Sequence, residues 1–154
     1  LRAHLPLHSM TVMMQKEVAA RLSAVPGSKD YGRLSIAVQL VADVATAFTV
    51  SRHAFVPAPN VDSAIVTLTQ RSEPLATVQS PESFDRLVRG AFASRRKTLW
   101  NNLVALFGKP NKDAIRTALS VAEIAPETRA EQLAIADFAR LDEALRGEGL
   151  GIAG

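Results

Sequence analysis

The sequence contains no cysteine, and this absence excludes disulfide bonds, thiolate zinc sites and cysteine nucleophiles. Aromatic residues are scarce as well, at 5% of the 154 positions, with one Trp and one Tyr. No apolar run approaches the ~18 residues that a membrane-spanning helix needs, so we expect no membrane partner. A chain without cysteine suits a reducing compartment, and we expect it to be cytoplasmic.

The sequence begins Leu1-Arg2-Ala3-His4, without an initiator methionine and without the pattern of a secretory signal. We therefore expect the chain to be the middle of a longer protein. Apolar residues make up 47% of the sequence, which is enough to form a buried core and argues against a disordered chain.

Charge is unevenly distributed, although the net charge is only +3. Residues 86–112 carry seven basic side chains and no acidic one, whereas residues 113–154 carry four basic and eight acidic side chains. The seven basic residues are Arg86, Arg89, Arg95, Arg96, Lys97, Lys109 and Lys112. A local basic block of this kind is typical of a protein that binds a polyanion.

The first part of the chain has the pattern of mixed strands and helices. We predict strands at residues 9–16, 44–50 and 61–69, and helices at residues 17–24 and 33–41. The first strand is almost entirely apolar before its polar end, so we expect it to be buried. Pro57 and Pro59 stiffen the connector between the last two strands, which favours an antiparallel, hairpin-like pair.

The second part of the chain reads as helical. Ser80 and Pro81 have the residue types of an N-cap and a first helical position, and Gly108 ends the second helix. Two further helices are expected at residues 112–119 and 135–145. We divide the chain into β-containing residues 1–70, a linker at 71–81, a helical domain at 82–146 and a flexible tail at 147–154.

Several kinds of site are excluded by the motifs that are missing. His4 and His8 have a spacing that would place both rings on one helix face, but Pro6 breaks that helix and no carboxylate accompanies them, so we expect no metal. The sequence has no G-x-S-x-G elbow, no Walker loop and no G-x-G-x-x-G motif. The chain alone therefore has no evident nucleotide-binding site.

Two features are candidates for RNA binding. The segment from Arg95 to Leu99 is basic, and Asn101 and Asn102 add amides that can meet phosphates or bases. The alternative is a solvated helix end whose cations complement the helix dipole. Phe55, which precedes a polyproline-like stretch between two strands, can stack on an unpaired base. The alternative is a ring that only plugs the end of the hairpin.

Four segments form an ordered set of motifs. They read Gln15-Lys-Glu-Val-Ala-Ala-Arg-Leu22, Pro26-Gly-Ser-Lys-Asp-Tyr-Gly-Arg-Leu-Ser35, Phe55-x-Pro-x-Pro-x-Val-Asp-Ser63 and Phe92-x-x-Arg-Arg-Lys-Thr-Leu99. In order and spacing they resemble the ribosomal small-subunit RNA adenine dimethyltransferases, the kasugamycin-resistance methyltransferases, whose loss of activity alters kasugamycin sensitivity. The resemblance runs from about residue 9 to residue 145.

The resemblance implies an α+β fragment. It would be the C-terminal part of a class I, Rossmann-like methyltransferase sheet with an antiparallel hairpin, followed by a small all-α, RNA-binding domain. In the family, the glycine-rich loop and the acidic ribose ligand that bind S-adenosylmethionine lie upstream of the Gln15 segment. We therefore expect no cofactor-binding residue in this chain, and no activity from the chain alone.

The resemblance also implies roles for individual residues. Phe55 matches the aromatic residue that stacks on the flipped target adenine, and it is the one catalytic candidate. Lys29, Tyr31 and Arg33 match a loop that borders the active-site cleft and touches RNA.

The basic segment matches a second RNA-binding element of the family. Arg95, Arg96 and Lys97 match a basic helix that contacts the rRNA backbone, and Trp100 departs from the usual Arg at its position. We expect further RNA contacts from Arg86, Arg89 and Asn101.

The parent activity implied is methyl transfer from S-adenosylmethionine to N6 of two adjacent adenosines near the 3′ end of 16S rRNA, during small-subunit maturation. The full-length enzyme is expected to be a monomer. The amine must be turned out of conjugation and aligned with the sulfonium methyl, which a clamped, flipped base provides. A non-catalytic RNA-binding or ribosome-assembly module, and a protein-interaction domain that meets an acidic partner, are the alternatives.

Overall fold

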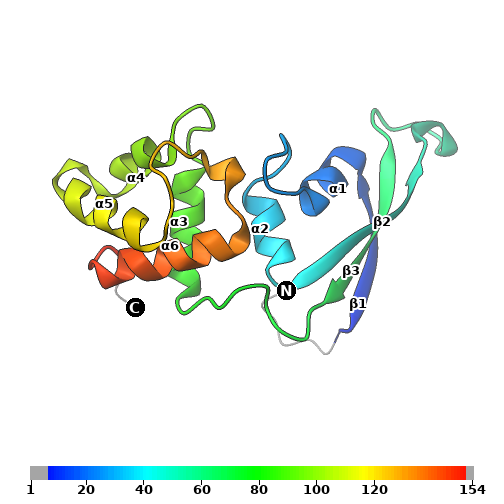
Figure 1. Ribbon diagram of the computed structural model, residues 1–154. Helices are drawn as coiled ribbons and strands as arrows, with labels where there is room; N and C mark the ends of the chain where they lie inside the picture. The colour runs from blue at the N-terminus through cyan, green and yellow to red at the C-terminus, as the bar shows by residue number, and fades with distance from the viewer. Residues whose placement is uncertain (1–6, 152–154) are drawn as a thin grey trace. The chain divides into compact units, whose positions relative to one another are not determined.

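The computed structural model describes residues 7–151, which divide into two compact units (Figure 1). The first runs to Val25 and resumes at Asp30–Leu75, and we call it the sheet unit. The second takes Pro26–Lys29 and continues from Ala76, and we call it the helical unit. None of the helices in the described range is long and apolar enough to cross a membrane.

The sheet unit is built on three antiparallel strands, β1 (Ser9–Gln15), β2 (Ala42–Val50) and β3 (Ser63–Gln70). The strand order is β1-β3-β2, so β3 lies in the middle and pairs with both neighbours. The predicted antiparallel pair is confirmed as β2 and β3. Its register shifts between Thr46 and Phe48, where a bulge bends β2.

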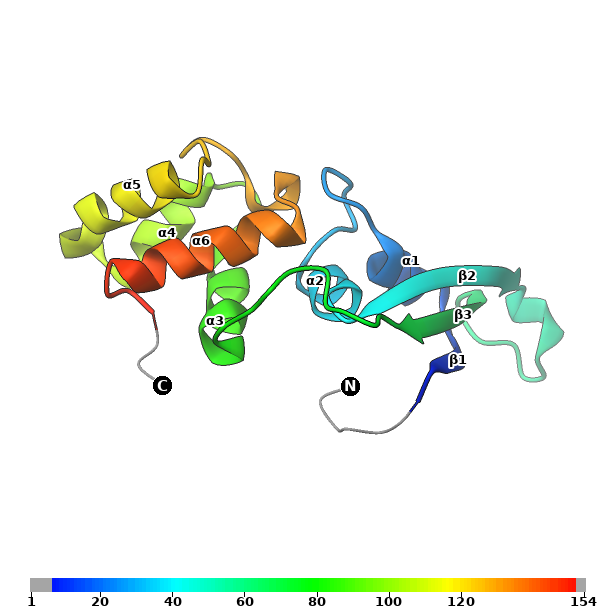
Figure 2. The ribbon, with the colours of Figure 1, turned by 60° about the horizontal axis from the view of Figure 1, so that its bottom comes forward.

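Two helices cover one face of this sheet (Figure 2). They are α1 (Lys16–Ser23) and α2 (Arg33–Gln39). Because side chains alternate along a strand, Ala64, Val66 and Leu68 of β3 point to the same face and pack against Ala19 of α1. Gln39 fastens the end of α2 by donating from Nε2 to the carbonyls that end α1, Leu22 O at 2.7 Å and Ala24 O at 2.8 Å.

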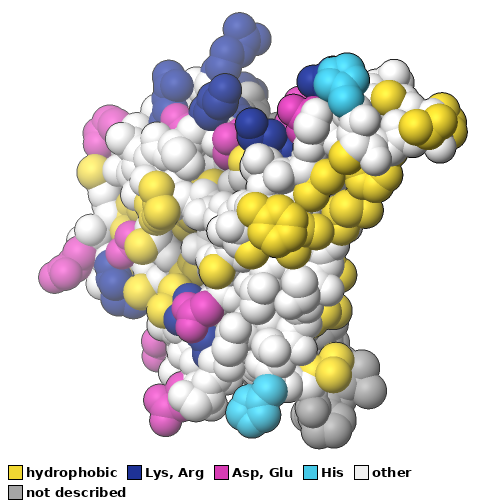
Figure 3. Space-filling view, turned by 90° about the vertical axis from the view of Figure 1, so that its right-hand side faces the viewer, with side chains coloured by type: hydrophobic (Ala, Val, Ile, Leu, Met, Phe, Trp, Pro, Cys, Tyr) yellow, Lys and Arg dark blue, Asp and Glu magenta, His cyan; other side chains and the backbone are white. Residues whose placement is uncertain are grey.

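The opposite face of the sheet is open in the described chain. Met13 of β1 is 54% exposed and Phe48 of β2 is 59% exposed. The strand predicted at residues 9–16 is present as β1, but the prediction that it is buried is wrong. β1 pairs only with β3, and the helices cover only one face of the sheet. Figure 3, viewed from the strand side of Figure 1, shows a band of hydrophobic side chains on the surface.

The helical unit consists of four main helices (Figure 2). They are α3 (Pro81–Ala91), α4 (Leu99–Phe107), α5 (Lys112–Val121) and α6 (Ile135–Gly147). Short 3₁₀ turns lie at η2 (Lys109–Asn111) and η3 (Ala130–Gln132). Each main helix places apolar side chains at helical spacing into one core, for example Leu87, Leu103, Ile115 and Phe138, each at most 1% exposed.

The ends of these helices follow the expected capping chemistry. The Ser80 hydroxyl accepts from the Ser83 N–H at 3.2 Å, and Pro81 occupies the first helical position, as predicted. Gly108, with a φ of +92°, ends α4 in the left-handed region that glycine tolerates.

The structure differs from the expected flexible tail at residues 147–150. α6 runs to Gly147, and Leu150 N–H donates to Leu145 O at 2.9 Å while Gly149 N–H donates to Arg146 O at 3.0 Å. Gly149 has a φ of +78°, so these residues form a Schellman motif that satisfies the last carbonyls of the helix. Residues 152–154 of the expected tail lie outside the described range.

Candidate nucleic-acid interface

Phe55 lies at the end of a short, hydrogen-bonded turn between β2 and β3. The turn is η1 (Arg52–Ala54), in which Ala54 N–H donates to Ser51 O at 3.0 Å and Phe55 N–H donates to Arg52 O at 3.4 Å. Ser51 also caps the turn, because its hydroxyl accepts from His53 N–H at 3.2 Å. The Phe55 ring is partly exposed. The backbone of Phe55 is therefore held by the turn, and its ring offers surface for stacking.

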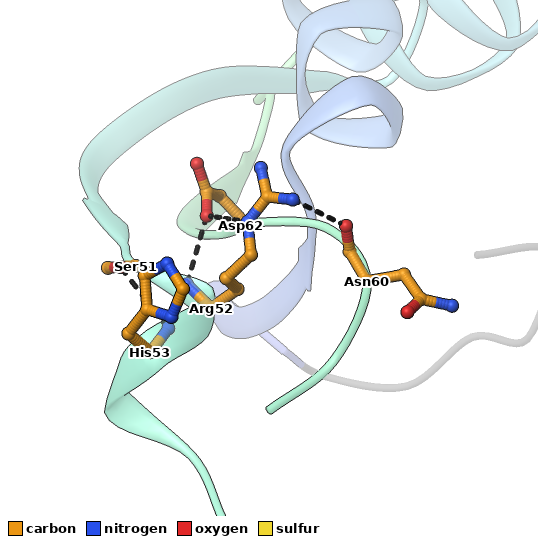
Figure 4. Close-up of polar contacts among 5 residues, drawn as sticks. All are labelled: Ser51, Arg52, His53, Asn60 and Asp62. Carbon is orange, nitrogen blue, oxygen red and sulfur yellow. Dashed lines mark hydrogen bonds and ion pairs between the residues drawn. The ribbon is translucent and has the colours of Figure 1, made fainter. Parts of the chain in front are cut away.

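The two limbs of the Phe55 loop are joined by Arg52 and Asp62 (Figure 4). Arg52 Nε donates to Asp62 Oδ1 at 3.1 Å, and the Arg52 N–H donates to the same oxygen at 2.9 Å. The Arg52 N–H and guanidinium together lower the pKa of Asp62, because both favour the charged carboxylate. The sequence motif contained Asp62 but gave no sign of its partner, since Arg52 lies outside the motif.

The segment around Lys29 separates into exposed and buried residues. Lys29 and Arg33 are exposed, but Tyr31 is only 1% exposed. The prediction that Tyr31 touches RNA is not compatible with this burial, because its ring belongs to the interior. Arg33 begins α2, so its side chain lies in the sheet unit.

Lys29 is held in the helical unit by its backbone. The Arg95 guanidinium donates to the Lys29 carbonyl oxygen, and Gly27 N–H donates to Glu131 O at 2.6 Å. The Arg95 bond joins Lys29 to a residue 66 positions later in the chain, and the Gly27 bond joins the neighbouring backbone to Glu131. Arg95 therefore has a structural partner, whereas the sequence suggested only a phosphate contact.

Arg95, Arg96 and Lys97 lie on a turn between α3 and α4, and the prediction of a basic helix at this place is wrong. Lys97 N–H donates to Ser94 O at 3.1 Å and closes the turn. Thr98 then starts a new helix, because its hydroxyl accepts from Asn101 N–H at 3.3 Å. We call Ser94–Lys97 the basic turn.

The Asn102 side chain stabilises the basic turn by hydrogen bonds to the backbone of the turn and of the residue that ends α3. Its amide is buried, with the residue 3% exposed, and Nδ2 donates to Ala91 O at 2.8 Å and to Ser94 O at 3.0 Å. The expectation that Asn102 meets RNA is therefore wrong, while Asn101 is exposed as expected. The sequence did hold a signal, because Asn102 occupies an i+3 position from Leu99 on the apolar face of α4.

Some cations of the basic block have partners inside the chain. Arg86 lies over the Phe107 ring at 5.3 Å from its centroid, and Arg89 pairs with Asp85 at 3.1 Å. Trp100 is the residue that departs from the family pattern. The Arg116 guanidinium carbon lies over the Trp100 ring, 5.2 Å from the ring centroid.

Other cations of the block are exposed and unpaired. Within residues 7–151, no ion pair is formed by Arg96, Lys97, Lys109 or Lys112. These cations are therefore available to a polyanion. Arg96 and Lys97 are adjacent on the basic turn, and the RNA contacts expected of them stay a prediction.

The described residues contain no group of three potential metal ligands, and His4 of the considered histidine pair lies outside them. The strand-to-helix junction of β1 and α1 is Gln15-Lys16, which has no glycine to let a phosphate or sulfonium ligand approach the backbone. This junction of the described chain therefore does not have the form of a ligand-binding loop, and the expectation that the cofactor-binding residues lie outside the chain stays a prediction.

The fold places the chain among the Rossmann-like methyltransferases, since it matches two solved structures of that class. A dimethyladenosine transferase from Plasmodium falciparum gives a TM-score of 0.81 at 28% identity, covering 97% of this chain and 62% of that chain. The 23S rRNA methyltransferase ErmE gives 0.58 at 25% identity, covering 90% and 55%. The predicted fold class, with an antiparallel hairpin followed by an all-α part, is confirmed.

The chain belongs to the ribosomal RNA adenine dimethylase family, whose model matches residues 1–146. It is 60% identical over 147 residues to a ribosomal RNA small subunit methyltransferase A from Latilactobacillus sakei, covering 94% of this chain and 50% of the relative. A protein of the same name from Streptococcus thermophilus is 51% identical over 152 residues, covering 97% and 52%. The resemblance stated from the motifs is confirmed, and the chain spans about half the length of these curated relatives.

Proposed function

We propose that this chain is the part of an rRNA adenine N6,N6-dimethyltransferase that holds the RNA and clamps the target base. The parent enzyme transfers methyl groups from S-adenosylmethionine to two adjacent adenosines near the 3′ end of 16S rRNA, in the maturation of the small subunit. The observation that carries the proposal is Phe55, a partly exposed ring on a fixed turn, within the segment that resembles the family's base-stacking motif.

The chemistry explains why a ring is needed at this place. The N6 amine of adenine is conjugated with its ring, so methyl transfer requires a base that is flipped out and held in line with the donor. Stacking of a base on an aromatic side chain contributes about 1–3 kcal/mol. S-adenosylmethionine supplies the methyl group to the parent enzyme, and its binding residues are expected outside this chain.

The basic turn supplies affinity for the RNA backbone. Arg96 and Lys97 are exposed, unpaired within residues 7–151, and held on a turn of defined shape. Contacts with phosphates release counterions and carry no sequence preference, so these cations position the RNA while the Phe55 loop receives the base. We further propose that the parent enzyme acts as a monomer in the cytoplasm.

The test is methyl transfer by the full-length parent to undermethylated small subunits. We expect the wild-type enzyme to form N6,N6-dimethyladenosine, and Phe55→Ala to lower turnover about 10–100-fold, which is the rate equivalent of the lost stacking energy. Val56→Ala is the matched control, because Val56 is the next residue and is 99% exposed. RNA binding without any methyl transfer by the wild-type parent would instead favour the non-catalytic RNA-binding module.

A further inference from the structure

The loop that carries Phe55 is closed at its base by one arginine. Arg52 directs its Nη1 to the carbonyl oxygen of Asn60 at 2.8 Å, in addition to the two bonds that it donates to Asp62 (Figure 4). Arg52 belongs to the limb that leaves β2, whereas Asn60 and Asp62 belong to the limb that enters β3. One side chain therefore joins both limbs of the loop.

This closure is tied to the rest of the sheet unit. The carbonyl oxygen of Asp62 accepts from Lys16 N–H at 2.9 Å, at the junction of β1 and α1. Asp62 is thus fixed by its main chain to the sheet and by its carboxylate to Arg52. Through Asp62, Arg52 is therefore linked to the junction of β1 and α1. In the sheet, β1 lies on the opposite side of β3 from β2, the strand that Arg52 follows.

Arg52 is also the residue on which the Phe55 turn begins. Its carbonyl oxygen accepts from Phe55 N–H, and its own N–H is held by the Asp62 carboxylate. Between Phe55 and Asn60, residues 56–59 make no hydrogen bond with the described part of the chain. The contacts of Arg52 are therefore the hydrogen bonds that join the Phe55 turn to the other limb of its loop.

We propose that Arg52 and Asp62 form a positioning clasp that orients Phe55 for stacking on the target base. This inference rests on the proposed function, since it assigns a purpose to the geometry of the same loop. Neither residue is a catalytic residue in the proposal, because both act through Phe55.

The alternative is an ordinary surface ion pair. Arg52 and Asp62 side chains are 44% and 35% exposed, and exposed pairs contribute little to folding. The clasp differs because it restrains a turn, and a displacement of about 1 Å at a reacting centre can cost about 10²-fold in rate. The two readings therefore predict different outcomes: small changes in stability in both, but a large loss of turnover only for the clasp.

The experiment uses the full-length parent and undermethylated small subunits. We expect Asp62→Ala and Arg52→Ala to lower kcat about 10–50-fold with KM changed less than about threefold. Asp62→Asn should restore much of the rate, because its amide oxygen still accepts from Arg52. Asp43→Asn is the matched control, since it weakens a comparable ion pair of the same unit, with Arg71 at 2.8 Å, away from the Phe55 loop.

A double-mutant cycle with Phe55→Ala tests whether the clasp acts through the ring. We expect Asp62→Ala to cost nothing further in the Phe55→Ala background. An equal loss in both backgrounds, or no loss in either, overturns the clasp. If Phe55→Ala itself leaves turnover unchanged, the stacking role in the proposed function fails as well.

Hydrogen exchange separates the clasp from the proposed function. The amides of Ala54 and Phe55 should exchange faster in Asp62→Ala and Arg52→Ala than in the wild type, and at the wild-type rate in Asp43→Asn. Unchanged exchange in the clasp variants overturns the inference whatever the enzyme's activity. Faster exchange in a parent that transfers no methyl group supports the clasp while rejecting the proposed function.

Discussion

Replacing Asn102 by alanine should destabilise the helical unit and release the basic turn. The substitution removes both hydrogen bonds of a residue that is 3% exposed, so Ala91 O loses its side-chain donor and Ser94 O keeps only the Lys97 N–H. A buried polar group that loses its partner costs about 1–3 kcal/mol. The carbonyl of Ser94 is only partly buried, so water replaces part of its loss.

The gain in helix propensity opposes this loss of stability, but it is small. Alanine is better than asparagine inside a helix by about 0.7 kcal/mol at most. Combining these contributions, we expect Asn102→Ala to lower the free energy of unfolding by about 2 kcal/mol. For a protein of about 150–250 residues, that change lowers Tm by about 4–8 °C.

The measurement is thermal and urea unfolding of the full-length protein with two comparison variants. Asn101→Ala alters the neighbouring, exposed asparagine and should change stability by less than about 0.5 kcal/mol. Asn102→Asp keeps the size of the side chain but places carboxylate oxygens against two carbonyl oxygens, so it should destabilise more than alanine. The reasoning is refuted if Asn102→Ala is no worse than Asn101→Ala, or if Asn102→Asp is the more stable of the two Asn102 variants.

Two further predictions concern charge. Combined Arg96→Ala and Lys97→Ala should reduce the slope of log binding constant against log salt by about two for RNA, as expected for two phosphate contacts, and an unchanged slope would reject that role. Burial raises the pKa of Asp142, whose carboxylate accepts from the Ser83 hydroxyl at 2.6 Å, so its contribution to stability is fully present below the unfolded pKa and is lost as the pH rises through the folded pKa. Asp142→Asn should therefore gain stability relative to the wild type as the pH is raised from 4 to 8, and a constant difference in Tm would contradict this.

The parts of the fold that depend on local chemistry were predictable from the sequence. Ser80 and Pro81 began a helix, and Gly108 ended one, because capping depends on a few neighbouring residues. The pairing of β2 with β3 followed from two β-branched segments and a stiff connector. The motifs also identified the family, since four ordered segments are specific even where individual residues are not.

The parts that depend on distant contacts were not predictable. The resemblance implied a basic helix at Arg95–Lys97, but these residues form a turn, and the Asn102 side chain that bonds to this turn comes from the next element. Tyr31 was predicted to contact RNA because it matches a family motif, but tertiary packing buries its ring. The bonds from Arg95 to Lys29 and from Arg52 to Asp62 join segments that no periodicity relates.

We propose that Phe55 holds the target adenine during methyl transfer, and this role can be measured in the full-length parent. Single-turnover methylation of undermethylated small subunits by the full-length parent, followed alongside subunit binding, separates stacking from folding and affinity. We expect Phe55→Ala to lose about 10–100-fold in rate while the subunit affinity changes by less than about threefold. An equal loss of rate and affinity, or no loss of either, would contradict it.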